Sequence, residues 1–140
     1  MYRQKNIRHI ITTALLLMLT VGIGVCADKP KYKFASGQSH NFGAMVNDST
    51  ATKVSHDFLL VNRSKTVPLV IINALCPCKC TSVDYPHRPI EVGDTARITV
   101  TYDPRGQELG GFHKYIRVVM RDVTTTEFLQ IKGKIKSKLK

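Results

Sequence analysis

The sequence predicts an all-β domain that folds as a single β-sandwich. Beyond residue 27 no segment repeats its apolar residues at the helical period of about 3.6, whereas several short segments alternate apolar and polar residues. Stretches rich in Gly, Pro, Asn and Asp separate these segments and provide the turns between them. Six or seven short strands at this spacing are typical of two sheets packed face to face.

Each expected strand follows from its own pattern. In 53–62 the side chains of His56, Phe58 and Leu60 fall on one face, and we expect His56 to be a hydrogen-bonded structural histidine. Segment 68–75 is almost continuously apolar, which fits a strand that is covered on both faces or contains a bulge. The expected strands are 31–34, a piece near 40–43, 53–62, 68–75, 96–102, 112–120 and 127–135.

The C-terminal segment from residue 131 carries a lysine at every second position. On a strand these lysines share one face, with Ile131 and Ile135 on the other. Because lysines on an edge strand discourage aggregation, we expect a solvated edge strand. The alternative is attraction to anionic lipid headgroups, surface polysaccharide or nucleic acid. The lysines are Lys132, Lys134, Lys136, Lys138 and Lys140.

Residues 1–27 are not expected to belong to the fold. A basic start precedes 16 uncharged residues at 10–25, and the small residue Ala27 follows shortly after. This is the pattern of a secretory signal peptide cleaved after Ala27, and the apolar run is short for an uncleaved membrane anchor. We therefore expect a signal peptide at 1–27, a sandwich domain with a basic C-terminal strand at 28–140, and a periplasmic or cell-surface location.

Cys26 offers a second processing route. Bacterial lipoproteins carry their lipid on a cysteine that follows a small residue, and here Val25 precedes Cys26. In that case the same domain is anchored to the membrane, and otherwise no membrane contact is expected. Cleavage after Ala27 instead removes Cys26 and leaves the domain with three cysteines.

Composition and motifs argue against most enzyme classes. The chain has a net charge of +11, and its few acidic residues are scattered rather than paired. It has no Ser-His-Asp spacing, no phosphate-binding glycine loop and no His-Glu-x-x-His motif. Thiol redox chemistry is therefore the only catalytic activity that we consider. Export into an oxidising compartment favours paired or metal-bound thiols.

Several segments resemble a bacterial family of exported proteins, the domain-of-unknown-function family 1573. The resemblance covers most of 32–136 and rests on Cys-x-Cys-Thr at 78–81, Tyr-Pro at 85–86 and Pro-Ile-x-x-Gly at 89–93. It implies an immunoglobulin-like sandwich, akin to the major sperm protein and pilus-chaperone domains, without an established activity. The family usually has Cys-Gly-Cys, where this chain has Lys79 in the middle.

Cys76, Cys78 and Cys80 are the residues most open to interpretation. Cys76 is additional to the family pattern, and the three cysteines alternate within five residues. Thiolates suit Cu(I) and Zn, and His87 follows closely enough to complete a metal site. We expect no other cofactor. More distant candidate ligands are His40, His56 and His113.

Two other interpretations of this cluster remain open from the sequence. One is redox chemistry at a disulfide between Cys78 and Cys80. The nearby cations Lys79 and Arg88 are expected to lower the pKa of the thiols, which makes the thiols more reactive. The alternative is structural, with a local disulfide or buried thiols stiffening a corner between a strand and a loop. Pro77 favours a corner because proline interrupts strand pairing.

We expect a non-enzymatic envelope module that binds a protein or a surface polymer, and not nucleic acid. Domains of this kind bind partners by adding a strand to an exposed sheet edge. The alternative is soft-metal binding or thiol redox chemistry at the cysteine cluster. Short matches to a bacterial O-glycosylation signal at 48–50 and 94–96 make Ser49 and Thr95 candidate sites, which we expect in turns.

Overall fold

The computed structural model describes residues 31–137 of the 140-residue chain. The expected signal peptide, its cleavage after Ala27, the lipid alternative at Cys26 and the last two lysines of the basic strand lie outside these residues. Across 31–137 there is no helix long and apolar enough to cross a membrane.

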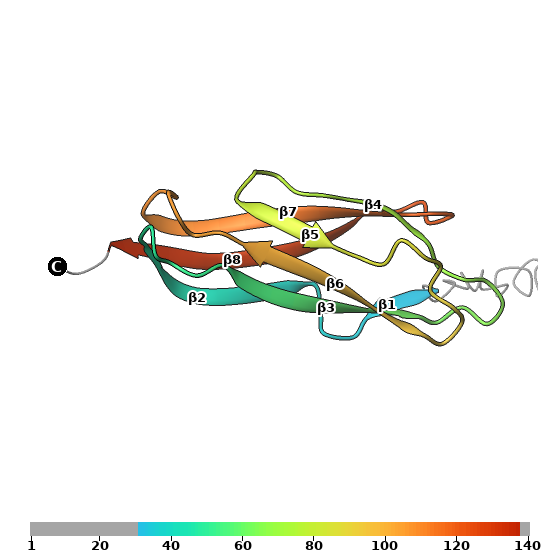
Figure 1. Ribbon diagram of the computed structural model, residues 1–140. Helices are drawn as coiled ribbons and strands as arrows, with labels where there is room; N and C mark the ends of the chain where they lie inside the picture. The colour runs from blue at the N-terminus through green and yellow to red at the C-terminus, as the bar shows by residue number, and fades with distance from the viewer. Residues whose placement is uncertain (1–30, 138–140) are drawn as a thin grey trace, which may run out of the picture.

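The described chain is all-β, as predicted, and its strands form two four-stranded sheets packed face to face (Figure 1). The strands are β1 (Tyr32–Phe34), β2 (Ser39–Asn47), β3 (Val54–Asn62), β4 (Ile71–Leu75), β5 (Thr81–Asp84), β6 (Thr95–Tyr102), β7 (Gly110–Met120) and β8 (Glu127–Ser137). Sheet A has the order β1-β3-β6-β5, and sheet B has the order β2-β8-β7-β4. All neighbours are antiparallel except β2 and β8, which are parallel.

β1 and β2 are two halves of one edge segment. β1 pairs with β3 in sheet A, and β2 pairs with β8 in sheet B. The chain passes between the sheets at 35–38, where Gly37 adopts a φ of 76° that favours glycine. Seven of the eight strands correspond to segments that the sequence predicts, all except β5, and the immunoglobulin-like sandwich is confirmed.

A second crossing lies at the opposite edge of the sandwich. Residues 76–80 connect β4, at one end of sheet B, to β5, at one end of sheet A. This segment contains the three clustered cysteines. The sequence did not predict β5, because its four residues, Thr-Ser-Val-Asp, contain only one apolar side chain.

The core lies between the sheets and follows the predicted alternation. Phe58 and Leu60 point inward from β3 and are fully buried, as are the facing residues of β6, β7 and β8. Burial of this apolar surface provides most of the driving force for folding. The residues of this core with no exposed surface are Phe58, Leu60, Ile98, Val100, Ile116, Val118, Leu129 and Ile131.

The apolar segment 68–75 is a strand with a bulge, which was one of its two predicted forms. Leu69 forms an isolated bridge with Ile90, and the pairing of β4 with β7 shifts register between Ile71 and Asn73. β4 is covered on its inner face alone, because Ile71 and Ala74 are buried in the core while Ile72 is 55% exposed.

The prediction that the lysine-rich strand lies at a sheet edge is wrong. β8 is an interior strand, because β7 pairs with it on one side and β2 on the other. The alternation is nevertheless as predicted, since Ile131 and Ile135 are buried and the lysines that follow each of them are exposed. The position was missed because β2 was expected only as a short piece near 40–43, whereas it has nine residues.

Asn62 is a buried polar residue that connects three loops. Its side chain is 1% exposed and donates hydrogen bonds to the carbonyls of Val67 (3.0 Å) and Ile90 (2.9 Å). Its Oδ1 accepts a hydrogen bond from the backbone N–H of Ser64 at 2.9 Å. Its own N–H donates to the carbonyl of Asp94 at 2.9 Å. The end of β3 is thereby fixed to the segments that precede β4 and β6.

We predict that Asn62→Ala lowers the free energy of unfolding by about 3 kcal/mol, because it leaves two carbonyls and one N–H without their partner in a buried place. Urea denaturation of the variant measures this loss. Asn73→Ala, at an exposed position on β4, is the control and should change stability by less than about 0.5 kcal/mol. Equal losses in both variants would contradict the role of Asn62.

Candidate functional site

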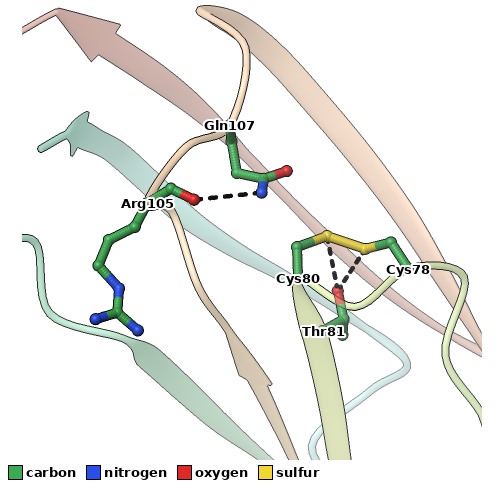
Figure 2. The surroundings of a disulfide bond; sticks show 5 residues. All are labelled: Cys78, Cys80, Thr81, Arg105 and Gln107. Carbon is green, nitrogen blue, oxygen red and sulfur yellow. Dashed lines mark hydrogen bonds between the residues drawn. A yellow bond between two sulfur atoms is a disulfide. The ribbon is translucent and has the colours of Figure 1, made fainter. Parts of the chain in front are cut away.

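Cys78 and Cys80 form a disulfide within the crossing between β4 and β5 (Figure 2). Their Cα atoms are 5.3 Å apart, and only Lys79 lies between them. The structure therefore contains the pairing that the sequence suggested for these two residues. Cys76 is the one free cysteine among the described residues, and it is half-buried against the core.

Thr81 anchors this disulfide to sheet A. Its side chain is buried, and its Oγ1 lies 3.4 Å from Cys78 Sγ and 3.7 Å from Cys80 Sγ. Because disulfide sulfurs have no proton, the hydroxyl is the donor in these contacts. The Cys80 carbonyl also accepts a hydrogen bond from the N–H of Asp103 at 2.8 Å, beyond the end of β6.

Arg105, in the turn after β6, does not direct its guanidinium at the disulfide. Figure 2 shows the Arg105 side chain extending away from the two sulfurs. Its guanidinium instead donates to Asp103, with Nε 2.8 Å from Oδ1. Hydrogen bonds from Arg105 hold the pKa of Asp103 well below its usual range, although partial desolvation acts in the opposite direction. Asp103 therefore keeps its charge and its turn geometry across the physiological pH range.

The free thiol of Cys76 is less reactive than the sequence suggested. Burial raises its pKa, which lowers the fraction of thiolate at neutral pH. The two cations expected to have the opposite effect, Lys79 and Arg88, are exposed residues. Cys76 thus resembles a structural thiol rather than a nucleophile.

The metal site predicted at the cysteine cluster is not assembled among the described residues. Within 31–137 no group of three or more His, Cys, Asp or Glu side chains is arranged to hold a metal ion. Cys78 and Cys80 are bonded to each other, so in this state neither is a thiolate. His87 is exposed, and its ring lies against that of Tyr85 with the centroids 4.7 Å apart.

The structure brings together two other histidines that the sequence treated separately. His40 of β2 and His56 of β3 stack across the sheets, with centroids 3.6 Å apart and ring planes within 10°. Phe42 packs edge-on against His40, and Phe58 packs edge-on against His56, each with centroids 4.7 Å apart. His56 is therefore half-buried in an aromatic stack between β2 and β3.

The stack disfavours a charge on His40. Burial lowers the pKa of His40 from its ordinary value of 6.5, and the nearby His56 lowers it further. A partial signal was present in the sequence, because His40 and His56 each precede a phenylalanine by two residues in an expected strand. It could not show that the two strands lie in different sheets and meet at one edge.

The candidate glycosylation residues lie at the surface. Ser49 is exposed in the turn after β2, as expected. Thr95 is also exposed, but it is the first residue of β6 and does not lie in a turn, because the turn before β6 ends one residue earlier.

We predict that the Cys78–Cys80 disulfide contributes only about 1.5 kcal/mol to the free energy of unfolding, because it closes a loop of three residues. Urea denaturation of Cys76→Ser/Cys78→Ala/Cys80→Ala, compared with Cys76→Ser alone, measures this difference. A loss of about 4 kcal/mol or more would show that the bridge has a larger structural role than loop closure.

We predict that stability falls as the pH decreases below about 6.5. The folded pKa of His40 lies below its unfolded value, so in this range the unfolded chain binds more protons, which stabilises it relative to the folded state. The contribution of neutral His40 to the free energy of unfolding is fully present above pH 6.5. It is lost as the pH falls toward the folded pKa of His40. His40→Phe should remove much of this dependence, whereas His87→Gln, at an exposed histidine, should preserve it.

Comparison with known proteins supports the fold and gives no activity. No curated protein matches the sequence. A protein of unknown function from Porphyromonas gingivalis W83 has a TM-score of 0.57 at 10% identity, with 74% of this chain and 46% of that chain covered. This chain thus spans less than half of that protein.

Two further structures have the same sandwich. The ASH/PapD-like domain 7 of human CEP192 has a TM-score of 0.62 at 14% identity, with 86% of this chain and 97% of that chain covered. The VesB protease of Vibrio cholerae has a TM-score of 0.55 at 13% identity, over 76% of this chain and 32% of that chain. At these identities the likeness concerns the fold alone.

The family is established by the sequence match itself. The model described as "Protein of unknown function (DUF1573)" matches residues 33–135. This range includes all of the strands except the first residue of β1 and the last residues of β8. The chain belongs to the DUF1573 family.

Proposed function

We propose that the protein is an exported, non-enzymatic binding module that holds an envelope protein by adding a strand of that protein to an open edge of the sandwich. The observation that carries this proposal is the difference between the two lateral edges. All four strands at the two edges have one strand neighbour each. At one edge, here called the closed edge, a single segment pairs with both sheets and has features that oppose further pairing, and at the other, the open edge, no described segment pairs with both sheets.

The closed edge consists of β1 and β2, and both strands have features that oppose pairing with another chain. β1 has only three residues and includes the exposed Lys33. β2 contains a bulge between Asn41 and Ala44, where Gly43 has a φ of 74°. Short length, lysine and bulges are the means by which natural edge strands avoid aggregation.

The open edge consists of β4 and β5, joined by the cysteine crossing. β4 has a single strand neighbour, β7, so its other side presents backbone groups without a strand partner. The strand has a register shift between Ile71 and Asn73, but unlike β1 it has no charged residue. Two of its apolar side chains are well exposed, Ile72 at 55% and Leu75 at 39%. An uncharged strand with exposed apolar side chains is suited to β-augmentation.

A non-enzymatic role is supported by the chemistry of the cysteine crossing. Two of its three sulfurs are joined in a disulfide, and burial keeps the third protonated at neutral pH. The bridge instead stiffens the segment beside β4 and β5. A rigid neighbouring loop reduces the ordering cost when a partner strand is added.

We predict that a photo-crosslinking amino acid at Asn73, in the middle of β4, captures a discrete envelope protein in cells. Crosslinked peptides should identify a partner segment with alternating apolar residues, because a strand presents successive side chains to opposite faces. Adding Leu75→Lys to the same chain should abolish the adduct, since lysine opposes edge pairing.

The matched control is Leu109→Lys, which places the same charge at a 61% exposed leucine outside β4 and β5. This variant should keep the adduct. An adduct that survives Leu75→Lys, or one that both lysine variants remove equally, would contradict binding at the β4 edge.

A further inference from the structure

The outer face of sheet A has a mixed charge. Asp57 of β3 and Asp84 of β5 both pair with Thr99 of β6, so the two carboxylates lie on the same face. Arg97 forms an ion pair with Asp57, with Nη1 3.3 Å from Oδ2. This face therefore has no strong preference for ligands of one charge.

The outer face of sheet B is basic. Within its described strands the only acidic residue is Glu127, which is half-buried and accepts hydrogen bonds from Tyr32 and Gln38. Arg117 of β7 is exposed on this face. The exposed lysines of β8 on the same face are Lys132, Lys134 and Lys136.

A shallow hollow of about 390 Å³ lies in the middle of this basic face. Lys132 and Lys134 line it from β8, His113 from β7 and Asn41 from β2. Among residues 31–137, no acidic side chain lines it. Two ammonium groups beside one hollow favour an anionic group of a ligand.

The local backbone explains why the hollow exists. β2 shifts register between Asn41 and Ala44, so its backbone bends where it passes Gly133 of β8. The ring of Phe112 lies against Gly133, where a Cβ would come within 2.8 Å of Cε1. Phe112 in turn stacks on Tyr102, with the ring centroids 4.2 Å apart. The floor of the hollow is thus fixed by core packing.

Exposed aromatic and amide groups continue from the hollow along the sheet. Tyr115 is 47% exposed and Phe128 is 46% exposed. His113 lies between Tyr115 Oη, 3.4 Å from its Nδ1, and Gln130 Oε1, 3.3 Å from its Nε2. Tyr115 pairs with Gln130, and Arg117 pairs with Phe128, so these groups form successive rows on one face.

We propose that the outer face of sheet B is a binding site for an anionic polysaccharide. A carboxylate or sulfate of the polymer lies between Lys132 and Lys134, and neighbouring sugar rings lie on Tyr115 and Phe128. Rows on one face of a strand are about 6.5–7 Å apart, which suits an extended chain of rings. Aromatic faces pack against the C–H faces of sugars, and Gln130 supplies hydrogen bonds to hydroxyls.

The pattern of polar groups favours a sugar polymer over a lipid surface. Amide and imidazole groups alternate with the rings, and their hydrogen bonds match sugar hydroxyls, which acyl chains lack. This site does not depend on the proposed pairing at the β4 edge. Leu75→Lys should therefore leave polysaccharide binding unchanged.

Calorimetric titration of the exported chain with dextran sulfate, oligogalacturonate and neutral dextran tests the site. We expect binding of at least one of the two anionic probes and none of neutral dextran. Lys132→Gln/Lys134→Gln should weaken binding by about tenfold or more, because it removes two charge-assisted contacts. Tyr115→Ala should weaken it by about fivefold to tenfold through loss of ring stacking.

The matched control is Lys33→Gln/Lys65→Gln, which removes two exposed lysines outside sheet B and should change affinity by less than about twofold. Equal weakening by both double variants would show diffuse charge attraction and overturn the site. Failure of both anionic probes to bind would also overturn it. Tight binding to phosphatidylglycerol vesicles, without binding to either anionic probe, would overturn it as well. That result would assign the face to a membrane surface. Thermal unfolding of each variant verifies that it is folded.

Discussion

The backbone hydrogen bonds of residues 31–47 are divided between two sheets. β1 pairs with β3 in sheet A, and β2 then pairs in parallel with β8 in sheet B. This division makes β8 an interior strand, places one continuous segment along an edge of the sandwich and brings His40 against His56. The opposite crossing, from β4 to β5, has no pairing of this kind. A disulfide joined to Thr81 and the end of β6 holds it instead.

The two crossings give the molecule unequal surfaces. Because β8 is interior, its lysines stand in the middle of a sheet face rather than along a rim, next to Tyr115 and Phe128. Because the cysteine segment only connects β4 to β5, these strands keep one side each without a strand neighbour. The two ligands that we propose, a protein strand and an anionic polymer, would therefore bind at separate places, and the cysteines lie beside the first of these.

The sequence predicted local features better than pairings. Alternation located most strands and the inward side of Phe58 and Leu60, because side-chain period and burial are properties of one strand. Pro77 and the cysteine spacing predicted a corner, and the structure has a crossing there. The prediction of an edge position for the lysine-rich strand was wrong, because its parallel pairing with β2 joins residues that are far apart in the chain. The histidine stack and the hollow at Gly133 were missed for the same reason, since each requires strands whose register no local pattern specifies.

Hydrogen exchange of the backbone amides, measured by NMR on the free protein, tests the central claim that the N-terminal segment pairs with both sheets while β4 keeps one side without a strand partner. Amides of β2 that bond to β8 should exchange slowly, at rates near those of β3, β6 and β7. In β4 the amides that point away from β7 should exchange quickly, so that fast and slow exchange alternate along the strand. Uniformly slow exchange in β4, or exchange in β2 as fast as in the turns, would contradict this account.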